Sequence, residues 1–135
     1  MNTIELNQRI DTYKLLLIKL QEAYSHQAKA LRVDATIKRF CYTYDLCCKI
    51  LKKLLFAHGI DTGSPREAIK AAFKENWIND EAIWIQMLKD RNITSHTYHE
   101  ETANQVYQDI FEFIPVLQKC SGLFAAKLGI IKNQG

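Results

Sequence analysis

The sequence predicts an all-α fold, an up-and-down bundle of about five helices that begins with two long ones. Apolar residues recur every three or four positions along most of the chain, which is the spacing of helices with one buried face. Only two prolines and five glycines are present to interrupt them. At 135 residues and 47% hydrophobic composition, the chain can bury a core without disulfides or metal. We therefore expect one domain over residues 1–135.

The two long helices are expected over residues 3–30 and 33–58. The apolar face of the first consists of Ile10, Tyr13, Leu17, Leu20 and Tyr24. The second has a longer apolar face, which consists of Ile37, Phe40, Cys41, Tyr44, Cys48, Leu51, Leu54 and Leu55. Gly59 follows at the position where glycine commonly ends a helix.

Two shorter helices are expected next. Ser64 begins a capping box with Glu67, and Pro65 occupies the first helical position, so a helix should start there and end by residue 77. The following helix should begin at Asn79 or Asp80, whose side chain can cap it, and run toward Arg91. Their apolar faces consist of Ala68, Ile69, Ala72 and Phe73 in the first, and Ile83, Trp84, Met87 and Leu88 in the second.

A break near residues 97–99 should separate these helices from a last one that begins at about Thr102. Its apolar residues are Val106, Ile110, Phe113, Ile114 and Leu117. Pro115 lies inside this pattern and should kink or end the helix, because proline lacks an N–H and clashes with the preceding turn. The tail, residues 121–135, still contains apolar residues and is expected to be partly packed or flexible.

The length of the first two helices predicts a homodimer. Helices of about 25 residues reach nearly 40 Å at 1.5 Å per residue, which is long for a compact monomer of this size. We expect part of their apolar surface to contact a second subunit, most simply across a two-fold axis.

Charge is distributed unevenly, although the formal net charge is only +3. Residues 1–60 contain ten Lys and Arg against five Asp and Glu, whereas residues 61–110 contain five against nine. The basic excess forms either solvated helix faces or a shallow surface that attracts phosphate. The N-terminal segment has no targeting pattern, and its longest apolar run, residues 15–18, is far shorter than a membrane span. We therefore expect a cytoplasmic protein without membrane contact.

The cysteines predict neither a disulfide framework nor a metal site. Cys41, Cys47, Cys48 and Cys120 lack the CxxC and Cys/His spacings of zinc or redox motifs. We expect buried free thiols that pack as small hydrophobic groups. No cofactor is expected.

Chemically useful side chains are densest between residues 90 and 98. Arg91 can bind a phosphate through its planar donors, and His96 can move a proton near neutral pH. The hydroxyl of Tyr98 is either a hydrogen-bonding group or a site of modification. On a continuous helix Arg91 and His96 would lie about 140° apart. They can converge if the helix unwinds at residues 94–95, or they can meet across a dimer axis.

An arginine beside a histidine suits the cleavage of RNA without a metal. The histidine can serve the attacking 2′-hydroxyl or the leaving 5′-oxygen, and Arg91 can stabilise charge on the phosphoryl oxygens. Asn92 could orient the histidine or hold a phosphate oxygen. The alternative is an arginine favoured by the helix dipole, an ordinary surface histidine and a packed Tyr98. His96, His99 and Glu100 are too few for a metal site.

Residues 91–98 match the R-x4-H-x-Y motif, and this part of the chain resembles the HEPN domains (higher eukaryotes and prokaryotes nucleotide-binding). With residues 37–46, 64–70 and 84–92, the resemblance extends over about residues 5–120. Within that group, the chain is most similar to the nucleotidyltransferase substrate-binding proteins.

The resemblance implies a dimeric helical bundle with the motif facing a cleft at the dimer interface. It also implies the toxin half of a toxin–antitoxin module whose other half is a minimal nucleotidyltransferase. Arg91 would then bind the phosphate, with Asn92 beside it, and His96 would be the acid or base of a metal-independent ribonuclease. Tyr98 would accept AMP from the partner, which neutralises the toxin. The alternatives are a nonenzymatic subunit that binds a nucleotide or substrate for its nucleotidyltransferase, and a plain dimerisation module.

Overall fold

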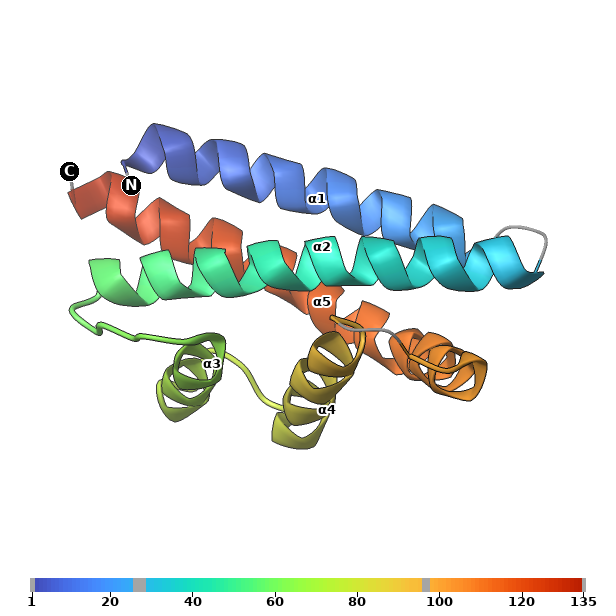
Figure 1. Cartoon of the computed structure of the whole chain (residues 1–135). Helices are drawn as coiled ribbons and strands as arrows, with labels where there is room; N and C mark the ends of the chain where they lie inside the picture. Colours follow the sequence, from blue (N-terminus) through green and yellow to red (C-terminus); the bar gives the residue numbers. More distant parts are fainter. Residues whose placement is uncertain (1, 26–28, 96–97, 135) are drawn as a thin grey trace.

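The computed structural model describes residues 2–25, 29–95 and 98–134, and all regular structure in these ranges is helical. Figure 1 shows the arrangement of the five helices, which are α1 (Thr3–Ser25), α2 (Lys29–Ala57), α3 (Pro65–Lys74), α4 (Glu81–Ile93) and α5 (Glu100–Gln134). The predicted all-α bundle is confirmed. The homodimer stays a prediction.

The three long helices form the body of the molecule. α1 and α2 are antiparallel neighbours, and α5 packs against both. The short helices α3 and α4 lie together on one side of α2, below it in Figure 1. α2 and α5 both run from right to left in that view, because α3 and α4 return the chain between them.

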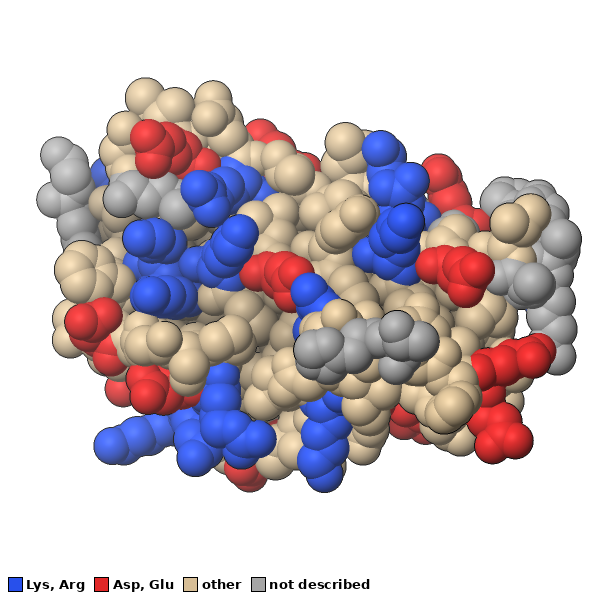
Figure 2. Space-filling view, viewed as in Figure 1, with Lys and Arg blue, Asp and Glu red and all other residues tan. Residues whose placement is uncertain are grey.

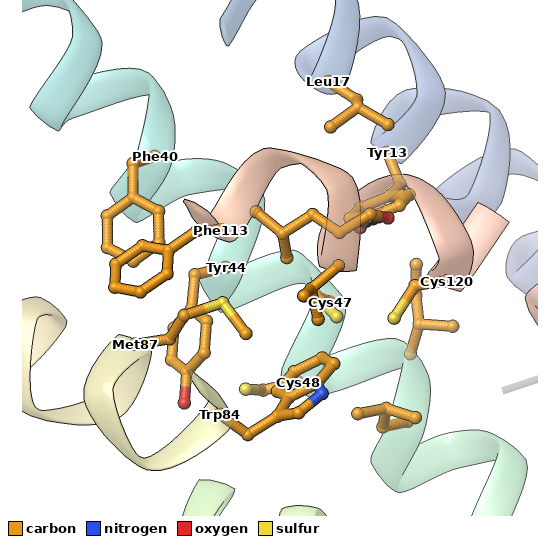
Figure 3. Close-up of a cluster of buried hydrophobic side chains, with 14 of the residues drawn as sticks. Tyr13, Leu17, Phe40, Tyr44, Cys47, Cys48, Trp84, Met87, Phe113 and Cys120 are labelled. Carbon is orange, nitrogen blue, oxygen red and sulfur yellow. Dashed lines mark hydrogen bonds between the residues drawn. The ribbon is translucent and has the colours of Figure 1, made fainter. Parts of the chain in front are cut away.

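The core is the shared apolar face of the long helices. Phe40 and Phe113, whose rings lie side by side in Figure 3, bring α2 and α5 together. Their ring centroids are 5.3 Å apart. Tyr13 of α1 lies edge-on to Phe124 at 5.2 Å, and its hydroxyl donates to the carbonyl of Leu117 at 2.6 Å. Every apolar residue predicted for the second helix is buried.

The cysteines are free and buried, as predicted. Cys47, Cys48 and Cys120 lie among the aromatic side chains in Figure 3. Burial raises the pKa of the Cys48 thiol to about 12, so the thiol stays protonated at neutral pH. Cys48 therefore contributes to packing and not to nucleophilic chemistry.

The predicted boundary between the first two helices was wrong. α1 ends at Ser25, and α2 already begins at Lys29, so Ala30 belongs to the second helix. Residues 29–32 are Lys, Ala, Leu and Arg, which are strong helix formers and extend α2 toward its N-terminus. The predicted stop is confirmed: α2 ends at Ala57, and Gly59 has a left-handed φ of 85°.

The cap predicted at the start of α4 was also wrong. Asp80 occupies the cap position but makes no hydrogen bond there with its side chain. Its backbone is left-handed, with φ 60° and ψ 50°, whereas a capping side chain normally extends from β-region backbone. The carboxylate instead lies 3.7 Å from Lys119 Nζ of α5.

Pro115 does not end the last helix. α5 continues through it to Gln134, and Figure 1 shows a change of direction along the helix instead of a stop. Pro115 is exposed, so its ring lies away from the core and water can reach the backbone group that loses its hydrogen bond. Beyond it, Phe124 and Leu128 are buried, which shows that the tail packs in part.

By length and composition alone, the segment Glu100–Asn133 could cross a membrane. A core helix can share these properties. The buried residues of α5 include Val106, Ile110, Phe113, Leu117 and Phe124. They belong to the core that α5 shares with α1 and α2. The absence of membrane contact stays a prediction.

The capping box at α3 gives a test of local stability. Ser64 Oγ accepts the N–H of Glu67 at 3.2 Å, and Glu67 Oε2 accepts the N–H of Gly63 at 2.6 Å. Ser64→Ala should lower the free energy of unfolding by about 1 kcal/mol in urea denaturation. Ser64→Asp should retain most of it, because a carboxylate can also cap. Equal losses in both variants would contradict this role.

Candidate functional site

Arg91 lies in the last turn of α4, and Asp45 of α2 holds its guanidinium. Nε and Nη2 donate to the two carboxylate oxygens at 2.9 and 3.0 Å, and Nη1 donates to Ser95 Oγ at 2.8 Å. The hydrogen bonds with Asp45 are the main reason that the pKa of Arg91 is raised, so the side chain stays charged. Among the described residues, Asp45 and Ser95 accept three of its five N–H groups, and Cys41 is a further neighbour of the guanidinium.

The end of α4 is determined by two hydroxyl residues. Thr94 Oγ1 bonds with the carbonyls of Asp90 and Arg91 at 3.0 Å each, and Ser95 Oγ donates to the carbonyl of Arg91 at 3.1 Å. The Arg91 carbonyl thus accepts from both hydroxyls, whereas the Asp90 carbonyl also accepts the backbone N–H of Thr94. The helix therefore stops at Ile93 and unwinds at residues 94–95, where the sequence predicted a poor helix interior.

A pocket of about 370 Å³ lies beside Arg91. It is formed where the end of α4 meets α2 and the start of α3, and its polar lining includes Asp45, Lys49, Lys52, Ser64, Arg91, Asn92 and Ser95. Three cations face one carboxylate, and the N-terminus of α3 adds the positive end of a helix dipole. The pocket therefore favours an anionic ligand. Asn92, predicted to bind substrate, is exposed and lines this pocket.

Tyr98 lies in a different pocket. That pocket has a volume of about 430 Å³ and is lined by Val33, Asp34, Tyr98, His99, Glu100, Ala103 and Asn104. Burial, followed by the neighbouring Asp34 and Cys41 side chains, raises the pKa of Tyr98, so its phenol is neutral at physiological pH. Cys41 also interacts with Arg91. The two motif residues therefore share a neighbour but not a pocket.

His96 lies outside the described residues. Its predicted convergence with Arg91 stays a prediction, as does the meeting of the two across a dimer axis. Within the residues that the structure describes, no group of three or more His, Cys, Asp and Glu side chains is arranged to hold a metal ion.

Asp90, which precedes Arg91, is a buried carboxyl group between α4 and α5. It is 2% exposed, and Gln86 Nε2 donates to its Oδ1 at 2.8 Å. Its Oδ2 has no partner among the described residues when both acids are ionised. When Asp90 is protonated, its carboxyl group can donate a hydrogen bond to the carboxylate of Asp109 in α5. Burial, and then this hydrogen bond, raises the pKa of Asp90 from 3.8 to about 7.

This carboxyl pair predicts a dependence of stability on pH. The unfolded chain releases the Asp90 proton near pH 4, whereas the folded chain holds it until about pH 7. The folded state is therefore favoured at low pH, and it loses this contribution as the pH rises from about 4 through 7. Asp90→Asn keeps a neutral donor, so at pH 8 it should exceed the wild type in stability by roughly 1–2 kcal/mol.

Denaturant unfolding between pH 5 and 8 checks this expectation. The wild type should lose stability across that interval, and Asp90→Asn should show a flatter profile. Asp109→Asn should also flatten it, because it removes the charged partner. Profiles that stay parallel in all three proteins would show that the proton is not held between α4 and α5.

Comparison with known proteins decides the family. Residues 8–123 match the model of the family described as nucleotidyltransferase substrate binding protein like. The chain belongs to this family. The resemblance stated from the sequence is thereby confirmed.

One curated relative has a named activity. The "Probable ribonuclease HepT" of Haemophilus influenzae is 31% identical over 87 residues, which cover 61% of this chain and 60% of the relative. The chain thus matches less than two thirds of that protein's length.

Two solved structures have the same fold. A protein from Thermus thermophilus superposes with a TM-score of 0.76 at 25% identity, over 83% of this chain and 98% of the other. A Haemophilus influenzae protein, described as the substrate binding domain of a nucleotidyltransferase, gives a TM-score of 0.66 at 22% identity. That match covers 92% of this chain and 99% of the other, and at this identity it shows the fold alone.

Sequence reasoning missed the partners of Arg91. Asp45 is 46 positions away, and only the packing of α4 on α2 brings the two together. A signal existed, because Asp45 is the one acid between residues 37 and 57. Lys49 and Lys52 follow it at helical spacing and reach the same pocket.

Proposed function

We propose that this protein is the HEPN component of a nucleotidyltransferase/HEPN toxin–antitoxin module and acts as a metal-independent ribonuclease. The observation that carries the proposal is the guanidinium of Arg91, which Asp45 holds at the edge of a basic pocket. The family and the relative named as a probable ribonuclease support it. We further propose that the active form is a cytoplasmic homodimer.

In the proposed reaction, the RNA supplies its own nucleophile. The 2′-oxygen forms a bond to the adjacent phosphorus, and the bond from phosphorus to the 5′-oxygen breaks. His96 takes the proton from the 2′-hydroxyl or gives one to the 5′-oxygen. Arg91 donates to the phosphoryl oxygens, where negative charge increases in the transition state, and Asn92 holds a phosphate oxygen. Because Asp45 already orients Arg91, little reorganisation is needed when the phosphate binds.

Neutralisation of the ribonuclease is proposed to occur at Tyr98. The partner nucleotidyltransferase would bind ATP, and the Tyr98 oxygen would attack the α-phosphorus with release of pyrophosphate. Since the pKa of Tyr98 is raised, its proton must leave to a base, which we assign to the partner. The ring of Tyr98 is half-buried, and the pocket of about 430 Å³ beside it has room for a nucleotide.

Removal of His96 should abolish cleavage. In EDTA, His96→Ala should cut RNA at least about 100-fold more slowly than the wild type, because general acid–base catalysis contributes that much or more. His99→Ala is the matched control and should retain activity, since His99 is exposed beside the other pocket. Wild-type rates in His96→Ala, with fold and oligomeric state unchanged, would exclude His96 as the catalytic group.

Removal of the Tyr98 hydroxyl should prevent AMP transfer. Co-expression with the partner nucleotidyltransferase should add one or more AMP masses to the wild-type chain, visible by intact-protein mass spectrometry. Tyr98→Phe should carry none, whereas Tyr42→Phe, which changes an exposed tyrosine of α2, should be modified normally. If AMP persists on Tyr98→Phe, another residue is the acceptor.

A nonenzymatic subunit is the second candidate. The family description favours it directly, since it names substrate binding and not cleavage. The separation of the Tyr98 pocket from the Arg91 pocket also fits a subunit that presents a bound nucleotide to its partner. Absence of cleavage by the wild type on several kinds of RNA, together with AMP on Tyr98, would favour this function.

A further inference from the structure

The outer face of α2 combines exposed apolar residues with lysines along most of its length. Leu31, Tyr42 and Phe56 are 72%, 50% and 64% exposed. The sequence spacings of seven, four and three residues put them on one stripe of the helix with three lysines. This α2 stripe consists of Leu31, Lys38, Tyr42, Lys49, Lys53 and Phe56. Because these three residues are 11 and 14 positions apart, they form no continuous apolar patch, and it is their alternation with lysines on one face that suggests a binding surface.

The charges of the stripe are unbalanced. Within the described residues, Lys38, Lys49, Lys52 and Lys53 have no ion-pair partner, while Asp45 at the stripe's edge is already paired with Arg91. Figure 2 shows Lys and Arg side chains gathered over the C-terminal half of α2. The stripe is therefore a cationic surface with two exposed aromatic rings.

We propose that the α2 stripe binds single-stranded RNA. Tyr42 and Phe56 would stack on unpaired bases, and Lys38, Lys49 and Lys53 would contact phosphates, which is how proteins hold single strands without reading sequence. Tyr42 and Phe56 are about 21 Å apart along the helix, so several nucleotides fit between them. As an assignment of how the substrate is held, this inference rests on the proposed ribonuclease function.

The stripe leads to the Arg91 pocket. Lys49 belongs to the stripe, and together with Lys52 it lines that pocket. A strand bound along α2 would therefore pass Arg91 with its phosphates on the side of the lysines. The geometry explains how the cleaved phosphate could be delivered to Arg91 while bases on either side remain held.

Charge argues for RNA over a second copy of the chain as the occupant. In a two-fold interface the same surface appears on both subunits, so the three lysines of one stripe would face those of the other. The stripe itself contains no carboxylate to compensate them: Asp45 at its edge is paired with Arg91, and exposed Asp34 lies only beside its N-terminal end. A polyanion supplies that compensation. The exposed rings favour a single strand, since bases in a duplex are already stacked.

The test measures RNA binding without cleavage, in the full-length His96→Ala chain. Fluorescence anisotropy with a labelled single strand of about 16 nucleotides gives the affinity. Tyr42→Ala and Phe56→Ala should each weaken binding about tenfold, because they remove a stacking surface, and Tyr42→Phe should preserve it. Leu15→Ala, which removes a similarly exposed apolar residue (53%) from α1, is the matched control and should bind normally.

The lysines are tested through the salt dependence of the same binding. Lys38→Gln combined with Lys53→Gln should reduce the slope of log K against log salt by about 1.4, since each contact with a single strand contributes about 0.7. Both lysines lie outside the Arg91 pocket, so this change reports on the stripe. An unchanged slope would show that Lys38 and Lys53 do not contact RNA phosphates, which contradicts the proposal.

Three results would overturn the inference. The first is normal RNA affinity in Tyr42→Ala and Phe56→Ala, and the second is equal affinity for a duplex of the same sequence. The third is that the wild type elutes as a dimer in size-exclusion chromatography whereas these two variants elute as monomers. The last result would assign the stripe to a second copy. Binding that depends on both rings without any cleavage by the wild type would support the stripe and reject the ribonuclease. RNA cleavage by the wild type, together with RNA affinity that is unchanged in Tyr42→Ala and Phe56→Ala, would support the ribonuclease and reject the stripe.

Discussion

The packing of α2 is the constraint on which the rest of the structure depends. α2 contacts each of the other four helices, and its buried residues extend from Val33 to Leu55. A helix enclosed on that many sides has one strip left for solvent, and in α2 this strip contains the lysines and exposed aromatic rings. Asp45 lies at the boundary between the two sides, half-buried, where it can reach α4. The position of Arg91 therefore follows from how α2 is enclosed.

The ion pair of Asp45 and Arg91 weakens the attraction of Arg91 for an anion but fixes the orientation of its guanidinium. A carboxylate bound to two guanidinium nitrogens offsets much of the attraction that Arg91 alone would have for a phosphate. In return, the side chain loses the rotamer freedom that a ligand would otherwise have to remove. Lys49 and Lys52 return the pocket to a net positive charge. The pocket thus separates two tasks: the lysines attract an anion, and the guanidinium of Arg91, held by Asp45, contacts it in a fixed orientation.

The sequence was most informative where structure is local. The apolar period located the helices and the buried residues of α2, and the box at Ser64 located the start of α3. Prediction failed where a neighbour in space decides the outcome. Asp80 adopts left-handed backbone with its carboxylate toward Lys119, and the partner of Arg91 comes from 46 positions away. The apolar periodicity of a sequence does not predict such pairs, because they form only when the helices pack against one another. The R-x4-H-x-Y motif could therefore be found in the sequence, but the contacts that hold Arg91 could not be predicted from it.

The separation of Tyr98 from the Arg91 pocket bears on how modification could inactivate the proposed ribonuclease. AMP on Tyr98 would not fill the Arg91 pocket by position alone, because the tyrosine lines a different cavity. It would, however, add a phosphodiester charge to a residue that shares its neighbour Cys41 with Arg91. Arg91 has N–H groups besides those bonded to Asp45 and Ser95, and an anion tethered nearby would compete for them with RNA phosphate at a high effective concentration. Inactivation would then follow from occupying these donors, with no change of fold.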